Sequence, residues 1–189
     1  KKRIDFPDGV SVYQMNLDKT DLLTLNCWSV GGVNLAFAYD INSDSYLDEN
    51  NLPTDLARHF DRYSYMFFND DWVPITVKAL HTRPHDSDQS ETIPSLMVWK
   101  KDDMEMGDRP TLINFYGGFS LNFLSYTRLG LNEPQFIMDG GIVLTAGIRG
   151  GTEKGHRWHE DGAHSEKINS AMDVILSLIH ISEPTRRTP

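Results

Sequence analysis

The sequence contains a single cysteine, Cys27, among its 189 residues, which excludes an internal disulfide bond. No apolar run approaches the roughly 18 residues of a transmembrane helix. Basic residues are scarce, since 18 lysines and arginines face 27 aspartates and glutamates and give a formal net charge of −9. A surface of this sign favours neither nucleic acid nor an anionic membrane as a partner.

Two regions differ in their hydrophobic pattern. In residues 3–46 apolar residues alternate with polar ones between the turn dipeptides Asp8-Gly9 and Gly31-Gly32, which predicts short antiparallel strands. Further along, strands are predicted at residues 73–80, 93–99, 111–115 and 141–148, with a helix that begins at Asn132-Glu133-Pro134 and ends at Gly140-Gly141. Strands that alternate with helices indicate an α/β sheet.

A last helix is predicted after Ser165, which has the side chain of an N-cap residue. Its apolar residues recur at spacings of i, i+3, i+4 and i+7, and they predict a buried face made of Ile168, Ala171, Met172 and Ile175.

Candidate functional residues follow the predicted strand 111–115. Tyr116-Gly117-Gly118-Phe119 combines two aromatic rings with two glycines that allow a tight turn and leave space for a ligand. On its own, this pattern is equally compatible with a plain turn.

A second glycine-rich segment, Gly147-Ile148-Arg149-Gly150-Gly151-Thr152-Glu153-Lys154-Gly155, follows the next predicted strand. Arg149 and Glu153 are expected to brace this loop by a charge-assisted hydrogen bond. A phosphate-binding loop is the alternative, but the Gly-Lys-Ser/Thr ending that it needs is missing.

These segments, together with Trp158-His159, Gly162, Lys167 and Asp173, resemble in their order the prolyl oligopeptidase family of serine peptidases. The resemblance implies a β-propeller that covers an α/β-hydrolase domain. It also implies that Tyr116 donates its phenolic hydroxyl to the oxyanion and that Phe119 lines the pocket for proline. A role in holding the loops is implied for Gly117, Gly118, Arg149, Gly150, Gly151, Glu153 and Trp158. The chain departs from the family's Asn-Ile-Arg-Gly-Gly-Gly-Glu-Tyr-Gly segment at Gly147, Thr152 and Lys154.

The nucleophile of such an enzyme is missing from the sequence. An α/β-hydrolase carries its serine in a Gly-x-Ser-x-Gly pattern, and no stretch of the 189 residues fits that pattern. The chain is therefore expected to be an inactive fragment of an enzyme that cleaves short peptides after proline. Two alternatives stay open, a peptidase that cleaves after basic residues and a non-catalytic scaffold that binds peptides through its propeller.

The expected domain organisation has three parts. Residues 1–55 correspond to the last propeller blade, and residues 56–175 to the N-terminal part of the hydrolase domain. The tail, residues 176–189, resembles the translation of a transposase adapter from sequencing libraries and is expected to be non-native. A genuine helix that ends before Pro184 is the alternative. Because the first residue is Lys1, the native N-terminus is expected to lie elsewhere, and the compartment stays open between cytoplasm and periplasm.

No cofactor and no metal ion is expected. His156, His159 and His164 lack the His-Glu-x-x-His spacing of a zinc peptidase, and a single cysteine offers no support for a structural zinc site. The expected partners are short peptides, without nucleic acid or membrane, and the parent enzyme is expected to be a monomer.

Overall fold

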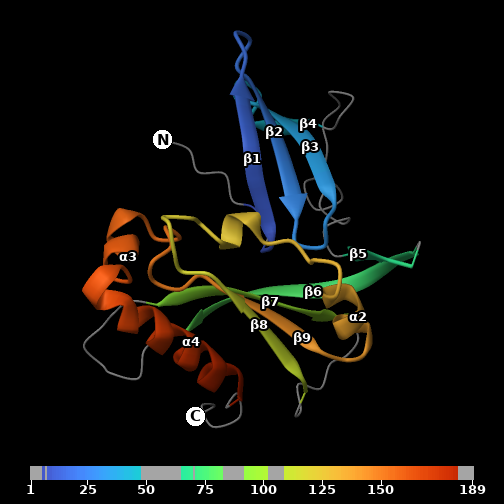
Figure 1. Cartoon of the computed structure of the whole chain (residues 1–189). Coiled ribbons are helices and arrows are strands. Elements are labelled where there is room, and N and C mark those ends of the chain that lie inside the picture. The colour runs from blue at the N-terminus through green and yellow to red at the C-terminus, as the bar shows by residue number, and fades with distance from the viewer. Residues whose placement is uncertain are drawn as a thin grey trace, which may run out of the picture.

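Two β-sheets form the framework of the chain in the computed structural model (Figure 1). The structure describes residues 6, 8–47, 65–69, 71–82, 92–101 and 109–182. The predicted domain boundary near residue 55 lies outside these residues.

The N-terminal sheet is an antiparallel meander. It consists of β1 (Val10–Leu17), β2 (Leu22–Ser29), β3 (Asn34–Asp40) and β4 (Ser45–Leu47), which pair in sequence order. Residues with positive φ make the turns between them, and Gly32 has φ of 88°. Leu25, Cys27 and Phe37 form the buried core on one face. The strands predicted from the alternating pattern are thereby confirmed.

The second sheet is mixed. Its strands are β5 (Tyr65–Phe68), β6 (Asp71–Thr82), β7 (Ile93–Lys100), β8 (Thr111–Phe115) and β9 (Ile142–Ala146), and they lie in the order β5-β6-β7-β9-β8. All pairs are antiparallel except that of β8 and β9, which is parallel. Every residue of β9 is buried, as expected of a continuous apolar strand covered on both faces. The predicted α/β sheet is confirmed.

A crossover connection joins the two parallel strands. The loop after β8 contains the short 3-10 helix η2 (Leu124–Tyr126) and leads into α2 (Glu133–Met138). Pro134 lies in the first turn of α2, and Gly140, with φ of 90°, follows its end. Both predicted boundaries of this helix are confirmed. Ile137 of α2 is fully buried against Val143 of β9.

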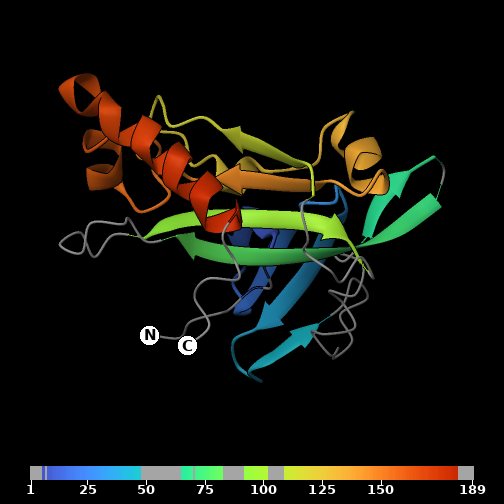
Figure 2. The ribbon, with the colours of Figure 1, turned by 90° about the horizontal axis from the view of Figure 1, so that it is seen from below.

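Three helical segments follow β9, namely α3 (His156–Glu160), the 3-10 helix η3 (His164–Glu166) and α4 (Lys167–Ser182). Figure 2 shows α4 crossing one end of the mixed sheet, where Val174 and Leu176 pack against Ile93, Ala146 and Ile148. In the described part of the chain, no helix is long and apolar enough to cross a membrane.

The predicted buried face of α4 is wrong. Ile168, Met172 and Ile175 are 65%, 45% and 48% exposed, and Ala171 is exposed as well. The buried side carries Ser170, Asp173 and Ser177 instead. Ser165 is not the residue before α4 either, because it lies within η3 and its hydroxyl binds Glu166.

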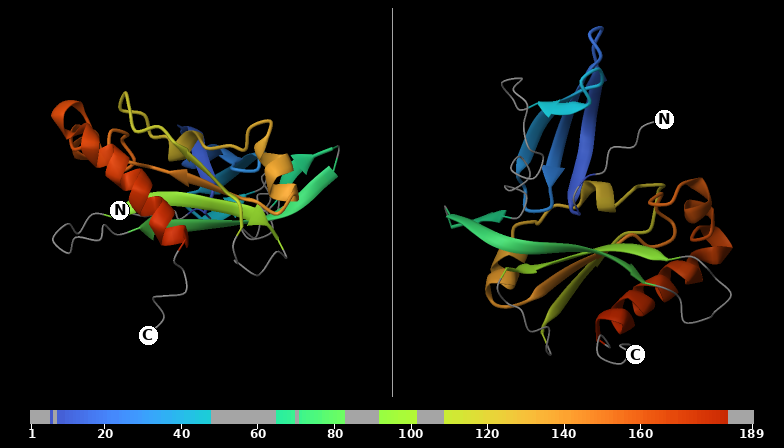
Figure 3. Two further views of the ribbon diagram at one scale, coloured as in Figure 1. Left: turned by 60° about the horizontal axis from the view of Figure 1, so that its bottom comes forward. Right: turned by 180° about the vertical axis from the view of Figure 1, so that it is seen from behind.

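The two sheets are joined by the end of β2 and the loop between β8 and α2. Trp28 donates its indole N–H to the carbonyl of Ser125 at 3.0 Å, and the amide of Leu129 donates to the carbonyl of Val30 at 2.8 Å. Figure 3 shows this loop lying between the two sheets. The loop that carries Tyr116 is therefore anchored to both.

Candidate active site

Tyr116 is placed by the end of β8. The strand stops at Phe115, and the chain then turns through Gly117, which has a φ of 59°. A side chain at Gly117 would put its Cβ 2.6 Å from Cγ1 of Ile148 and 2.9 Å from the carbonyl oxygen of Arg149. Only glycine fits this turn, and the turn leaves the Tyr116 ring 45% exposed at the edge of the sheet.

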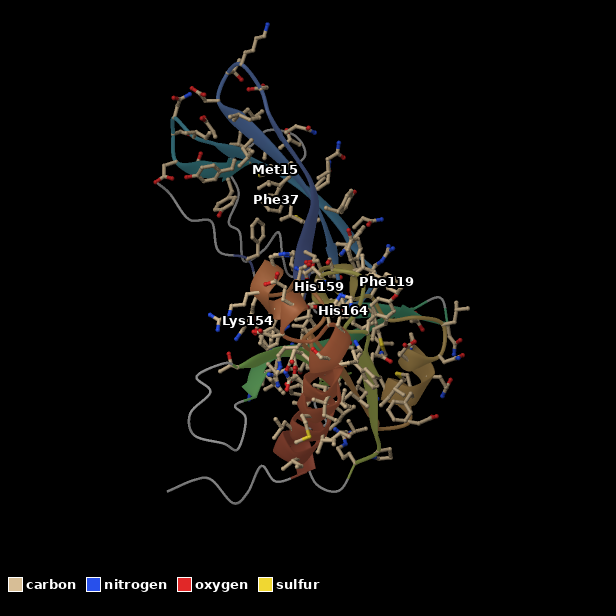
Figure 4. The ribbon with its side chains drawn as sticks, turned by 60° about the vertical axis from the view of Figure 1, so that its left-hand side comes forward. Met15, Phe37, Phe119, Lys154, His159 and His164 are labelled. Carbon is tan, nitrogen blue, oxygen red and sulfur yellow. The ribbon has the colours of Figure 1, made fainter. Side chains whose placement is uncertain are left out.

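The Tyr116 ring lies beside two phenylalanines. Its centroid is 6.3 Å from that of Phe119 and 6.1 Å from that of Phe123, distances typical of interacting aromatic pairs. Phe119 is 85% exposed, which excludes packing in the core of the described chain as its role. Figure 4 shows Phe119 on the loop between the two sheets. An exposed ring beside a half-exposed tyrosine forms an apolar surface next to a hydroxyl donor.

The backbone under Phe119 is strained. Phe119 and Ser120 have φ angles of 50° and 54°, a region that residues with a side chain occupy at a cost on the order of 1 kcal/mol or more each. Strain of this kind persists only where the surrounding structure enforces the conformation.

A second loop, residues 147–155, packs directly against the first. A Cβ at Gly150 would lie 2.2 Å from the carbonyl oxygen of Gly117, and one at Gly162 would lie 2.2 Å from the carbonyl carbon of Arg149. The amide of Gly150 donates to the carbonyl of Trp158 at 3.0 Å. Three glycines thus let three backbone segments touch, and we call Gly117, Gly150 and Gly162 the glycine seam.

Arg149 fixes the second loop to α4 through Asp173. Its guanidinium donates to the Asp173 carboxylate from Nη2 at 2.6 Å and from Nε at 2.9 Å, and its backbone amide donates to the same group at 2.9 Å. Arg149 is 9% exposed and Asp173 is fully buried. The expected bracing by a charge-assisted hydrogen bond therefore involves Asp173, 24 residues away, as the partner of Arg149.

The side of α4 that faces the loops supplies further polar contacts to them. Lys167 donates its ammonium to the carbonyl of Gly117, and the Ser170 hydroxyl donates to the carbonyl of Arg149 at 2.6 Å. With Asp173, these residues form a polar stripe at successive turns of the helix. The stripe explains why Ile168, Met172 and Ile175 are exposed, since the loop carbonyls and amides that face the helix need hydrogen-bond partners.

Glu153, in the second loop, holds the loop after β8 by a hydrogen bond. Its Oε1 accepts a hydrogen bond from the amide of Phe123 at 2.8 Å, at the start of η2. Within the described chain, its Oε2 is buried and has no hydrogen-bond partner. Burial raises the pKa of the Glu153 carboxyl above its ordinary 4.5, although hydrogen bonds from backbone amides partly oppose this shift.

Trp158 lies beneath the second loop. It is 3% exposed and donates its indole N–H to the carbonyl of Gly147 at 3.1 Å. The ammonium of Lys154 lies 4.8 Å from its ring centroid, within the range of a cation–π interaction. These contacts close the loop between Gly147 and Trp158 around an aromatic side chain.

In the described chain, His156, His159 and His164 do not cluster with other metal-binding side chains. His159 has its Nδ1 2.6 Å from the carbonyl oxygen of Gly150, so this nitrogen carries the proton. His156 lies 3.3 Å from Glu160 on the surface of α3. Among the residues that the structure describes, no group of three or more His, Cys, Asp or Glu residues could hold a metal ion.

The structure thus brings most of the predicted residues together around one turn. Gly117 and Gly150 touch in the glycine seam, beside Arg149 and next to Tyr116 in the sequence. Glu153 and Trp158 each hold one of the two loops by a hydrogen bond. No role was predicted for Lys167, Ser170 or Thr152. The signal for the first two was a polar residue at every third position of a helix, beside glycine-rich loops.

The chain is similar to known peptidases in sequence and in fold. No protein-family model matches the chain. A prolyl endopeptidase-like protein of Macaca fascicularis is 27% identical over 178 residues, which cover 87% of the chain and 23% of that protein. The prolyl endopeptidase of Elizabethkingia meningoseptica is 31% identical over 91 residues, 48% of the chain and 13% of that protein. The chain therefore spans less than a quarter of the length of these curated relatives.

A solved structure shares the fold. The oligopeptidase B of Leishmania major superposes with a TM-score of 0.64 at 21% identity, over 99% of the chain and 24% of that protein. The similarity covers both sheets of this chain, so their arrangement is one that occurs within a larger peptidase.

Proposed function

We propose that the chain, which is similar in sequence to prolyl endopeptidases, is part of a serine peptidase of the prolyl oligopeptidase family that cleaves short peptides after proline. In this proposal, the N-terminal sheet is a blade of a β-propeller, and the mixed sheet is the first part of an α/β-hydrolase domain. The name of the bacterial relative, prolyl endopeptidase, supports proline as the recognised residue.

The observation that carries the proposal is the position of Tyr116. Its ring stands half exposed at the end of β8, on a turn whose two glycines keep the adjacent space free of side chains. A phenolic hydroxyl at this place would donate to the oxyanion that forms when the scissile carbonyl is attacked. The serine, histidine and aspartate that carry out the attack would come from the rest of the enzyme.

Phe119 would form the apolar wall of the pocket for proline. Its ring is 85% exposed and 6.3 Å from that of Tyr116, so a bound proline ring could contact it while the adjacent carbonyl reaches the tyrosine hydroxyl. Burying such a surface against an apolar ring favours binding by roughly 25 cal/mol for each Å² removed from water.

The two alternatives are a peptidase that cleaves after basic residues and a propeller-bearing scaffold without catalysis. The fold, which is shared with the oligopeptidase B of Leishmania major, does not distinguish between them, because one fold can carry different functions. A basic substrate would also be attracted by the excess of acidic residues, 27 against 18 basic ones.

The test uses the full-length protein encoded by the gene that contains this sequence. We expect it to hydrolyse a blocked dipeptide amide ending in proline much faster than matched amides ending in arginine or alanine. Preference for the arginine substrate would support the basic-residue alternative. Absence of hydrolysis, together with no labelling of a serine by an organophosphonate, would support the scaffold.

A further inference from the structure

The turn at Phe119 and Ser120 places an apolar ring in solvent on a strained backbone. Both residues have positive φ, at 50° and 54°, although neither is glycine. Phe119 gains little from burial, since it is 85% exposed. Other contacts must therefore hold the turn in this conformation.

Thr152 supplies two of these contacts. Its hydroxyl donates to the carbonyl of Ser120 at 3.0 Å, and its amide donates to the carbonyl of Leu121 at 3.1 Å. A third bond closes the turn on itself, from the amide of Leu121 to the carbonyl of Gly118 at 3.1 Å. The second loop thus holds the first at the two residues that follow Phe119.

The hydroxyl is a feature that this chain adds to the resembled motif. The family segment has glycine at the position of Thr152, and glycine can offer the amide bond but not the hydroxyl bond. The hydroxyl and amide of Thr152 contact Ser120 and Leu121, so an effect on the site would pass through the Phe119 turn.

We propose that the Thr152 hydroxyl is a positioning group that fixes the Phe119 wall and thereby sets how tightly the site binds the substrate residue beside Tyr116. This inference rests on the proposed peptidase function. Loss of the hydroxyl frees the Ser120 carbonyl and lets the Phe119 turn relax toward an unstrained conformation, which moves the wall. The Tyr116 hydroxyl stays where β8 and the glycine seam put it.

The experiment compares four variants in the full-length protein. Thr152→Val keeps the shape and removes the hydroxyl, Thr152→Gly restores the family residue, and Thr152→Ser keeps the donor. Thr111→Val is the matched control, because Thr111 at the far end of β8 also donates its hydroxyl to a backbone carbonyl, that of Arg109. Each is assayed with the proline substrate, and hydrogen exchange is followed in the peptide that covers residues 116–123.

We expect Thr152→Val and Thr152→Gly to raise KM about fivefold, the effect of one net hydrogen bond, with kcat changed less than about twofold. Exchange in residues 116–123 becomes faster in the same two variants. Thr152→Ser restores both values to those of the unchanged protein, and Thr111→Val leaves KM and exchange as they were.

Several results would overturn the inference. An unchanged KM in Thr152→Val, a fall in kcat without a rise in KM, or a Thr152→Ser variant that behaves like Thr152→Val each contradicts positioning by the hydroxyl. If the full-length protein hydrolyses no peptide, the proposed function fails. Hydrogen exchange in residues 116–123 then decides alone whether the Thr152 hydroxyl holds the turn. Faster exchange in Thr152→Val but not in Thr152→Ser then supports the hold on the turn, and equal exchange refutes it.

Discussion

Arg149 and Asp173 form a buried ion pair that joins the glycine-rich loop to α4, with Nη2 of the arginine 2.6 Å from Oδ1 of the aspartate. The aspartate also accepts from the backbone amide of Arg149 at 2.9 Å. Charged groups so far from water are stable only when each has its partner. The pair therefore fixes both the side chain and the backbone of Arg149, next to the glycine seam.

Replacing Asp173 by asparagine should destabilise the protein strongly. The variant keeps the shape but removes the carboxylate that pairs with the buried guanidinium of Arg149, at a cost of about 3 to 5 kcal/mol. Urea unfolding would measure this as a lower midpoint. The control is Asp161→Asn, which removes an exposed ion pair with Arg157 at 3.7 Å and should cost about 0.5 kcal/mol or less. Equal midpoints for the two variants would contradict the structural role of the buried pair.

The Tyr116→Phe variant of the full-length enzyme should lose activity while its stability is retained. The change removes only the hydroxyl, and the ring keeps its contacts with Phe119 and Phe123. Loss of one oxyanion donor lowers kcat by about a hundredfold or more. Steady-state kinetics with a proline amide would measure the effect, with the melting temperature as control. An unchanged kcat/KM in the variant would mean that Tyr116 contributes packing alone and donates no hydrogen bond to the oxyanion.

Glu153→Gln should change how stability depends on pH. Burial raises the pKa of Glu153 above 4.5, so folding favours the protonated acid. Its contribution is fully present below pH 4.5 and is lost as pH rises through the raised pKa. The amide cannot ionise but still offers an oxygen to the amide of Phe123. The melting temperature of the unchanged protein minus that of the variant should therefore fall between pH 4 and pH 8.

A difference in melting temperature that stays constant over this pH range for Glu153→Gln would contradict the raised pKa.

The Cys27 thiol should be unreactive in the folded protein. Cys27 is fully buried in the N-terminal sheet, and burial raises the pKa of its thiol from 9.0 to about 11. The thiolate is the reacting species, and a rise of two pKa units lowers its population at pH 8 about a hundredfold. Ellman's reagent should react with the protein in urea at least that much faster than without urea. Equal rates would mean that the core around Leu25 and Phe37 is open.

The sequence predicted the strands well because their pattern is local. Alternation in β2 and β3 and the apolar run of β9 reflect burial of nearby residues against one or two faces. Helix α2 was predicted equally well, since Pro134 and Gly140 act on the backbone of their own segment.

The face of α4 could not be predicted in the same way. A hydrophobic pattern assumes that a helix packs on apolar side chains, but part of α4 packs on loop backbone. Ser170 and Asp173 are buried because they form hydrogen bonds with the carbonyl and the amide of Arg149. The sequence does not show that these two segments lie together, so it could not predict these hydrogen bonds. The partner of Arg149 was hidden for the same reason, since Glu153 was the nearer acidic residue in the sequence.

The candidate site could be predicted only in part. Tyr116 and Phe119 were identified as a motif, and their positions as exposed residues at the end of β8 came from the structure. Their roles in catalysis and binding stay predictions. The adapter-like tail stays a prediction as well. Leu176 packs on the core and Ser177 is buried, whereas Ile179 is 41% exposed and residues 183–189 lie outside the described chain.

The glycine seam has a consequence for how this chain can change by mutation. Any single-nucleotide change that replaces a glycine adds at least a Cβ, and at Gly117, Gly150 and Gly162 that atom would lie 2.2 to 2.6 Å from its nearest neighbour. Two of those nearest neighbours are backbone atoms, which no change of rotamer can move away. Each of the three codons is therefore constrained by backbone packing, whereas a change at Thr152, in the same loop, alters a side-chain contact and leaves the packing of the loops in place. Variation in this part of the gene should accordingly adjust the site without separating the loops that build it.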